Sequence, residues 1–239
     1  MSDDREDDRD DGLDALRDRL VLAALAHAPF EGWSQAALAA AARDAGLDPT
    51  MPERLFTQGP AQAVEHLAAL ADRRMEEAAR AHDLAAMRFP ERIAWLVRRR
   101  LEPWSAHREA LRRATSLLAL PTQGVRAARI AWRTVDAIWY AAGDVSTDFS
   151  YYTRRAILAA IYGATVLVWL DDESPECEET WAFLERRLAD QGRMHRAQTR
   201  AKSRLVHLPG TLRSLAGGRK RPGRPHRRSG ARTAPRSRP

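Results

Sequence analysis

Apolar residues recur every three or four positions from Leu13 to Leu188, with few β-branched runs and no strict alternation of apolar and polar residues. This period matches the turn of an α-helix and not the two-residue repeat of a strand. Pro29 is placed to end the first helix, Ser34 to cap the second and Gly46 to end it. Further helices are expected over 91–101, 105–119, 124–142, 148–170 and 175–191. The pattern predicts an all-α protein, and we find no internal repeat of 20–50 residues.

The helix expected over 148–170 is unusually apolar, because the fifteen residues Ala156–Leu170 carry no charge. The run is shorter than the roughly 18–20 residues that span a bilayer. A helix that is apolar on every side is expected to be enclosed on every side. In one small domain this requires a dimer partner, a ligand, or both; a plain core helix is the alternative. Small residues leave room beside it: Ala156, Ala159, Ala160, Gly163 and Ala164.

A polar turn separates this helix from the one before it. The preceding helix has an apolar seam made of Ala128, Trp132, Val135, Trp139 and Ala142. Gly143 is suited to end that helix, since glycine tolerates the left-handed conformation. Ser146, Thr147 or Asp148 can cap the next one, and Asp148 also favours the positive end of the helix dipole. Tyr151 follows at the entrance of the apolar helix with Tyr152, and tyrosine is enriched at protein interfaces.

Charge divides the chain into three parts. Residues 1–14 have eight acidic residues and two arginines, a net charge of −6. Residues 193–239 have fifteen Arg and Lys and no Asp or Glu, a net charge of +15, which leaves −2 for residues 15–192. The expected folded body is therefore almost neutral and lies between two tails of opposite charge.

The basic C-terminal part has two sections. From Arg193, apolar residues fall on one side of a helical pattern and basic residues around it, which indicates a membrane-surface helix; a solvated helix with no partner is the alternative. The residues expected to carry the membrane contact are Met194, Arg200, Lys202, Leu205 and Leu208. Residues 218–239 are rich in Arg and Pro, cannot form a core and are expected to be disordered. They would reinforce attachment to an anionic membrane, or bind nucleic acid non-specifically.

Cysteine content and the first residues bear on the compartment. Cys177 is the only cysteine, so an intrachain disulfide is excluded and a reducing compartment is expected. The acidic start resembles neither a secretory signal nor a mitochondrial transit peptide. We expect a cytoplasmic protein that associates peripherally with the inner membrane.

Motifs of catalysis are missing from the sequence. It contains no glycine-rich phosphate loop, no G-x-G-x-x-G and no G-x-S-x-G. None of the seven histidines follows an acidic residue by three positions, so the Glu-x-x-His pairs of di-iron bundles are absent. We expect no enzyme activity, no catalytic residue, no metal and no cofactor.

The first three helices resemble the helix-turn-helix of TetR-type regulators. A small-residue helix ends in Ala-Gly, and a short segment with Phe56 leads to a long connecting helix. DNA binding would need a basic recognition surface. Residues 31–60 instead have four acidic residues against Arg43 and Arg54, and "DPTMPERLF" carries two prolines. Specific DNA binding is therefore not expected, and the block is interpreted as a degenerate form of the motif.

A second resemblance covers about residues 13–192. "WRTVDAIWYAAGDVSTDFSYYTRRAILAAIYGATVLVWLDDES", followed by "TWAFLERRL" and preceded by "RIAWLVRRRLEPWSAHREALRRA", is similar to the coenzyme Q-biosynthesis accessory protein family. The resemblance implies a TetR-like helical bundle that no longer binds DNA, dimerises and holds isoprenoid lipids in its interior. It also implies that the protein assists the di-iron hydroxylase acting on demethoxyubiquinone, and that a C-terminal amphipathic helix contacts the membrane.

The same resemblance implies a surface patch that meets the hydroxylase. The matching positions are Asp148, Tyr151, Tyr152 and Ile138. Two positions depart from the family pattern: Ser150 stands where Asn is frequent, and Tyr151 where some members have Trp.

These observations combine into one expected organisation. The expected parts are an acidic disordered tail (1–12), a helix-turn-helix-like block (13–58), a helical lipid-binding and dimerisation domain (59–192), a basic amphipathic membrane segment (193–217) and a disordered tail (218–239). The residues expected to contact lipid are Trp139, Ala156, Ala160, Gly163 and Leu167. The leading hypothesis is a non-enzymatic accessory factor that binds an isoprenoid quinone precursor and presents it to the hydroxylase. A ligand-responsive transcriptional regulator is the alternative, and a membrane-surface scaffold without ligand is a third.

Overall fold

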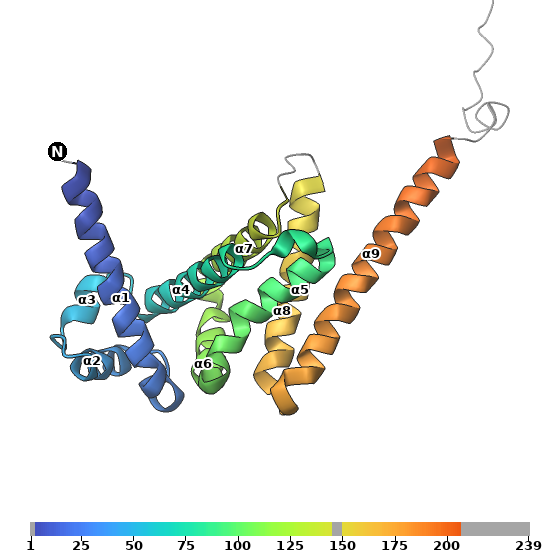
Figure 1. Ribbon diagram of the computed structural model, residues 1–239. Coiled ribbons are helices and arrows are strands. Elements are labelled where there is room, and N and C mark those ends of the chain that lie inside the picture. The colour runs from blue at the N-terminus through green and yellow to red at the C-terminus, as the bar shows by residue number, and fades with distance from the viewer. Residues whose placement is uncertain (1–2, 145–149, 207–239) are drawn as a thin grey trace, which may run out of the picture. The chain divides into compact units, whose positions relative to one another are not determined.

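The computed structural model describes residues 3–144 and 150–206, and every regular element in these ranges is helical (Figure 1). The prediction of an all-α protein is confirmed. The α-helices are α1 (Asp3–Glu31), α2 (Gln35–Asp44), α3 (Met51–Leu55), α4 (Pro60–Arg80), α5 (Phe89–Leu101), α6 (Arg108–Leu118), α7 (Gly124–Ala141), α8 (Ser150–Asp171) and α9 (Glu178–Val206). Short 3₁₀ turns join some of them: η1 (Leu84–Ala86), η2 (Glu102–His107), η3 (Pro121–Gln123) and η4 (Pro175–Cys177).

Helices α1 to α3 form the N-terminal block. Ser34 caps α2 as predicted, since its side chain accepts from the N–H of Ala37 at 3.1 Å. Gly46 follows the end of α2 with φ +70°, where glycine is favoured. The block is tied to the body by Trp33, whose indole N–H donates to the carbonyl of Ala110 in α6 at 2.9 Å.

Helix α1 differs from the prediction at both ends. It begins at Asp3, in the segment expected to be disordered, and acidic residues in a first turn interact favourably with the helix dipole. It also continues through Pro29 to Glu31. A proline in the last turn removes only one backbone hydrogen bond, and Gly32, with φ +66°, ends the helix instead.

Helices α4 to α8 form the body, in which α4 contacts α1, α5, α6 and α7, and α7 contacts α8. The core of the body contains fully buried side chains from several of these helices: Met75 of α4, Leu96 of α5, Val135 of α7, and Leu158 and Trp169 of α8. Helix α7 ends as predicted at Gly143, which has φ +88°. The expected caps of α8, Ser146, Thr147 and Asp148, lie outside the described residues.

A carboxylate organises the junction between α8 and α9. Asp172 accepts four hydrogen bonds: from the N–H and hydroxyl of Ser174 at 2.8 and 2.6 Å, and from the N–H and hydroxyl of Thr180 at 2.9 and 2.5 Å. Burial alone would raise the pKa of Asp172, but these bonds outweigh it and lower the pKa to about 2. The carboxylate therefore stays ionised and fixes the first turn of α9.

The chain divides into two compact units, residues 1–192 and 193–239. In the first unit, α9 contributes Trp181, Leu184 and Leu188 to the core. The second unit is described only from Arg193 to Val206, and these residues are the last part of α9.

Candidate functional site: an internal cavity and helix α8

A partly open apolar cavity of about 140 Å³ lies between the helices of the body, lined by α4, α5, η2, α6, α7 and α8. Its wall is mostly aliphatic and aromatic, including Leu67, Ala71, Trp104, Leu111, Ile130 and Val166. Whole ligand pockets are typically about 300–1,000 Å³. The cavity therefore fits one end of a long molecule, such as a ring or a short hydrocarbon segment.

One part of the cavity wall is polar. Arg100 of α5 donates to Asp72 of α4 at 2.7 Å, to the hydroxyl of Tyr162 of α8 at 2.5 Å and to the hydroxyl of Thr134 of α7 at 3.2 Å. Arg133 and Thr134 also donate to Asp72, at 3.2 Å and 3.0 Å. Four helices thus meet at one buried ion pair, and Arg100 and Tyr162 face the cavity.

The charge states of this cluster follow from its surroundings. Burial would lower the pKa of Arg100, but Tyr162 and Asp72 outweigh burial and raise it. Burial raises the pKa of Tyr162, against the opposing effect of the Arg100 charge. Arg100 is therefore a cation and Tyr162 a neutral phenol that keeps its proton.

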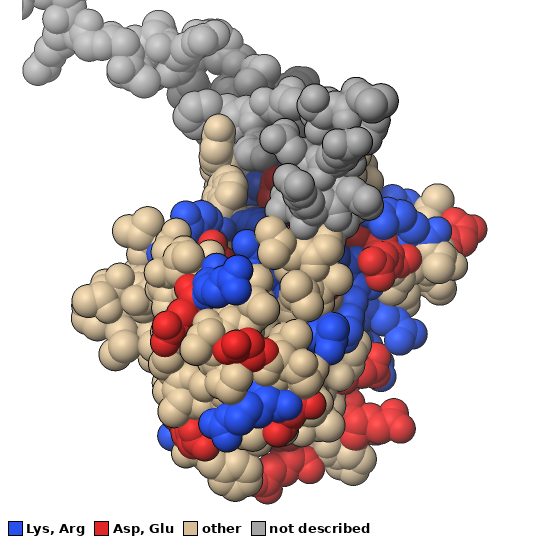
Figure 2. Space-filling view, turned by 90° about the vertical axis from the view of Figure 1, so that its left-hand side faces the viewer, with Lys and Arg blue, Asp and Glu red and all other residues tan. Residues whose placement is uncertain are grey.

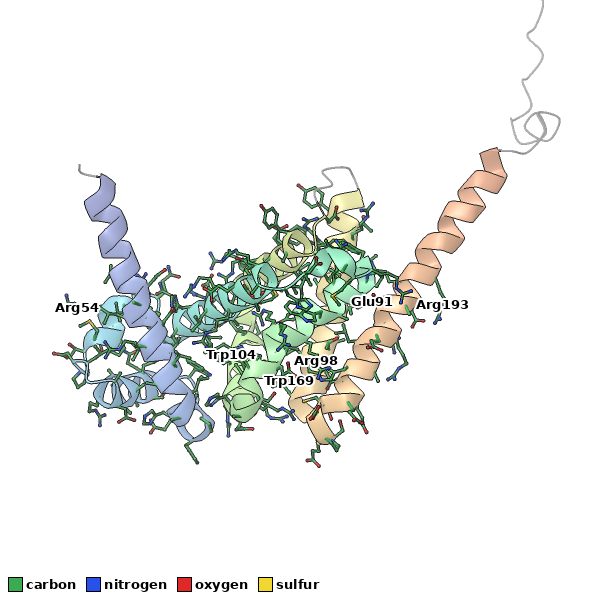
Figure 3. The ribbon with its side chains drawn as sticks, viewed as in Figure 1. Arg54, Glu91, Arg98, Trp104, Trp169 and Arg193 are labelled. Carbon is green, nitrogen blue, oxygen red and sulfur yellow. The ribbon has the colours of Figure 1, made fainter. Side chains whose placement is uncertain are left out.

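Two tryptophans from different elements also line the cavity, Trp104 of η2 and Trp169 of α8 (Figure 3). Trp169 is fully buried, its ring lies 5.2 Å from the guanidinium of Arg108, and its indole N–H has no partner in the described structure. The sequence analysis did not identify Trp104, Trp169 or Arg100 as site residues. Arg100 in particular stands in the run "RRR", which is typical of a solvent-exposed helix face.

In the single chain, helix α8 is enclosed on one side only, and the expected enclosure of its other side by a dimer partner or a ligand stays a prediction. Its inner face carries Leu158, Tyr162, Thr165 and Trp169, all buried. The outer face is formed by Tyr152, Ala156, Ala160, Gly163 and Leu167, and all five are exposed. A Cβ on Gly163 would meet no atom within 4 Å. We call these five residues the outer face of α8.

By length and composition, Tyr152–Asp171 would be sufficient to cross a membrane, with a mean hydropathy of 1.3. A core helix of a soluble protein passes the same test, and the inner face of α8 packs into the body.

The residues expected to bind lipid lie apart from the cavity. Ala156, Ala160, Gly163 and Leu167 belong to the outer face of α8, whereas the cavity is lined by Tyr162, Val166 and Trp169 of the same helix. Trp139 is buried elsewhere in the core, with its ring centroid 5.0 Å from that of Phe89. The lipid contacts of these residues therefore stay a prediction, and periodicity could not separate the two sides of α8 because both are apolar.

The expected partner patch is described only in part. Tyr152 is 68% exposed, and its ring stacks on Trp132 of α7 with 6.0 Å between centroids. Tyr151 lies in α8 but its side chain is outside the described part, as is all of Asp148. Ile138 is fully buried in the core, so its side chain is not available at the surface, contrary to the resemblance.

The N-terminal block presents mixed charge. Seen from the side of α1 to α3, acidic and basic side chains are interspersed on the visible face without a continuous basic area (Figure 2). Helix α3 is only five residues long and buries Pro52 and Leu55, while Arg54 is exposed (Figure 3). This arrangement gives phosphates little attraction.

A second, larger hollow of about 350 Å³ lies at the surface among α1, α4 and α7. Its lining is mainly polar and includes Arg17, Glu65, His66, Arg129 and Arg133. Glu65 is already paired with Arg129 at 3.1 Å and with Arg126. The hollow is therefore unsuited to hydrocarbon.

Two further expectations concern metals and the membrane. Within residues 3–144 and 150–206, no three His, Cys, Asp or Glu side chains are placed to hold a metal ion. Met194, Arg200, Lys202 and Leu205 belong to the helical part of α9, but their side chains are not described, and Leu208 lies beyond the described residues. The membrane contact stays a prediction.

Comparison with known proteins connects this chain to a protein family and to a solved structure. Residues 125–195 match the family model COQ9. The human ubiquinone biosynthesis protein COQ9, mitochondrial, is 33% identical over 216 residues, which cover 84% of this chain and 68% of that protein. The Drosophila melanogaster protein of the same name is 33% identical over 180 residues, covering 74% of this chain and 55% of that protein.

Among solved structures, a TetR transcriptional regulator from Nitrosomonas europaea superposes with a TM-score of 0.60 at 22% identity. The match covers 73% of this chain and 97% of the regulator. It confirms the TetR-like fold.

Proposed function

This chain belongs to the COQ9 family of ubiquinone biosynthesis proteins, and we propose that it serves there as a lipid-binding accessory factor without catalytic activity of its own. It would bind an isoprenoid quinone precursor at the membrane and present it to the di-iron demethoxyubiquinone hydroxylase. The relatives are named as biosynthesis proteins and not as enzymes.

The observation that carries the proposal is the internal cavity. It is apolar on most sides, lined by five helices of the body and polar at the Arg100 cluster. Small-molecule sites in proteins have this combination of an apolar wall and a few placed polar groups. A prenylated ring offers the matching pair of a polar head and a hydrocarbon tail.

The outer face of α8 supports dimerisation as part of the proposal. A row of small apolar residues on an exposed helix allows a second helix to approach closely, and Gly163 has free space above it. We propose a homodimer that buries this face from Ala156 to Leu167 and leaves Tyr152, at the start of α8, outside the dimer interface.

The membrane and the hydroxylase are the remaining proposed partners. The net charge of +15 beyond Gly192 supports attraction to an anionic surface, since the body itself is slightly negative. The exposed pair of Trp132 and Tyr152 supports a protein contact at the start of α8. The named relatives are mitochondrial proteins; for this chain we propose a peripheral position on the inner membrane.

A transcriptional regulator of the same fold is less well supported. The helix-turn-helix block has interspersed charge on the face seen in Figure 2 and a recognition helix of five residues.

The direct test is extraction of lipid from the purified protein, followed by mass spectrometry. We expect an isoprenoid quinone precursor or another prenyl lipid in a fixed ratio to the protein. Protein that carries no lipid, and whose melting temperature does not rise with added quinone precursor, would refute the proposal.

A further inference from the structure

The Tyr162 hydroxyl has an unused donor inside the cavity. It accepts a hydrogen bond from Arg100 at 2.5 Å, so one of its lone pairs is occupied. The hydrogen bonds of the described residues include none that this hydroxyl donates, and Tyr162 is only 9% exposed. Its oxygen is thus satisfied while its proton stays available to a ligand.

Arg100 determines the position of this hydroxyl. The guanidinium is held by Asp72, Thr134 and the carbonyl of Ala68, at 2.7, 3.2 and 3.3 Å, and it lies 5.3 Å from the centroid of the Tyr162 ring. The phenol is thereby fixed against α5 with its proton available. A donor that is preorganised in this way loses little freedom when it meets an acceptor.

A second donor lies on the same side of α8. Trp169 follows Tyr162 by seven residues, which is two helical turns, so both side chains fall on one face of the helix. Trp169 also lines the cavity and its indole N–H is without a partner. Two other indoles are bonded, since Trp33 donates to Ala110 at 2.9 Å and Trp181 to Glu176 at 2.8 Å. The buried indole of Trp139 also has no partner among the described residues, but unlike Trp169 it does not line the cavity.

The donors face a space that is too small for a whole prenyl lipid. About 140 Å³ accommodates one substituted ring or a short part of a tail. A hydrocarbon tail would leave the Tyr162 proton without an acceptor, whereas a ring with carbonyl or methoxy oxygens would provide one.

From this arrangement we propose that the cavity binds the oxygenated ring of the quinone, with Tyr162 donating to a ring oxygen and the isoprenoid tail directed outward. The ligand class is a neutral aromatic or quinonoid head that bears acceptor oxygens. This inference rests on the proposed function and adds the orientation of the ligand and the residue that selects its head.

The experiment compares two ligands that share a decyl chain, one with an oxygenated quinone ring and one with an unsubstituted benzene ring. Binding to the full-length protein is measured by calorimetry from detergent micelles, with decylbenzene and with a dimethoxybenzoquinone carrying the same decyl chain. Wild type is expected to prefer the quinone. Tyr162→Phe, which keeps the ring and removes the hydroxyl, should weaken quinone binding about fivefold to tenfold and leave decylbenzene unchanged.

Control variants distinguish the lost donor from a general effect. Tyr140→Phe removes the same hydroxyl from an exposed tyrosine of α7 and should leave both affinities unchanged. Trp33→Phe removes an indole N–H that is already bonded to Ala110, and should affect stability without altering the preference between the ligands. Trp169→Phe is a second cavity variant and should again weaken only the quinone, even if Tyr162→Phe is poorly folded.

The outcomes separate this inference from the proposed function. If wild type binds neither ligand, the proposed function fails. If wild type binds both equally, and neither Tyr162→Phe nor Trp169→Phe changes their ratio, lipid binding stands and the head-inward orientation is overturned.

Discussion

Arg100 of α5 and Asp72 of α4 form an ion pair, 2.7 Å from Nε to Oδ1, with both side chains almost fully buried. Because Asp72 also accepts from Thr134 and Arg133 of α7, one carboxylate connects three helices. The pair therefore joins the structural core to the wall of the cavity.

Asp72→Asn should strongly destabilise the protein, because it leaves the Arg100 charge buried without its partner. Removing one member of a buried ion pair costs about 3–5 kcal/mol of unfolding free energy. Urea unfolding followed by circular dichroism measures the loss. Glu102→Gln, which removes a half-exposed partner of Arg98 and Arg99, is the control and should change stability far less. Similar stability of the two variants would show that Asp72 does not hold the helices together.

The Asp172 carboxylate predicts a specific dependence of stability on pH. Its pKa is about 2 in the folded protein against an ordinary 3.8, so its contribution is complete above about pH 4 and is lost as the pH falls towards 2. Asp172→Asn should lower the unfolding free energy at pH 7 by on the order of 1–3 kcal/mol. Melting curves of both proteins should converge between pH 4 and pH 2, and a constant difference over that range would contradict the prediction.

Leu167→Glu tests the proposed dimer. Leu167 is 58% exposed in the isolated chain, so the variant should fold normally. In a dimer that buries the outer face of α8, the new charge would be desolvated and the dissociation constant should rise at least about tenfold. Sedimentation velocity gives the oligomeric state, with Val125→Glu, an exposed position at the start of α7, as the control. Equal dimerisation of both variants would place the interface elsewhere.

Tyr152→Ala tests the contact with the hydroxylase. Removing this exposed ring also leaves Trp132 without its stacking partner, so the aromatic area of the patch is lost while the core is untouched. The affinity for the purified hydroxylase should fall at least about tenfold, with the bound lipid retained. Asp148→Asn and Tyr151→Ala extend the test to the other positions of the patch. Phe30→Ala removes an exposed ring from α1 and is the matched control; wild-type affinity in all the patch variants would exclude this surface.

Neutralising the basic residues after Gly192 tests the membrane contact. A variant with Gln at Arg193, Arg196, Arg200, Lys202 and Arg204 loses five positive charges, each contributing about 1 kcal/mol near an anionic surface. Binding to anionic vesicles in a flotation assay should weaken at least about a hundredfold. Replacing Arg43 and Arg54 by Gln lowers the charge of the N-terminal block and should have little effect. Unchanged flotation of the five-residue variant would shift the contact away from this segment.

The ends of helices could be predicted from the sequence where the residues next to each end determine its conformation. Ser34, Gly46 and Gly143 were assigned correctly because a cap or a left-handed glycine acts within one turn of the backbone. Pro29 was misjudged for a related reason, since proline is costly in the middle of a helix but tolerated in its last turn.

Long-range packing limited the prediction of the site. The sequence indicated α8 as the unusual helix, yet both of its sides are apolar, so periodicity could not tell the inner face of Tyr162 and Trp169 from the outer face of Gly163 and Leu167. Arg100 was overlooked because its partner Asp72 lies 28 positions away. The function class could be inferred from the family motif. The cavity could not be inferred from the sequence, because its wall is made of residues from five helices that are far apart in the chain.

The two faces of α8 also bind the ligand and the dimer into one thermodynamic cycle. Tyr162 lines the cavity and Gly163, the next residue, belongs to the outer face. If a second copy covers the outer face and a quinone occupies the cavity, any factor by which the quinone tightens the dimer must equal the factor by which dimerisation tightens quinone binding. With a factor greater than one, a membrane that concentrates the protein would increase quinone binding, and dilution away from the surface would release the quinone without any separate signal.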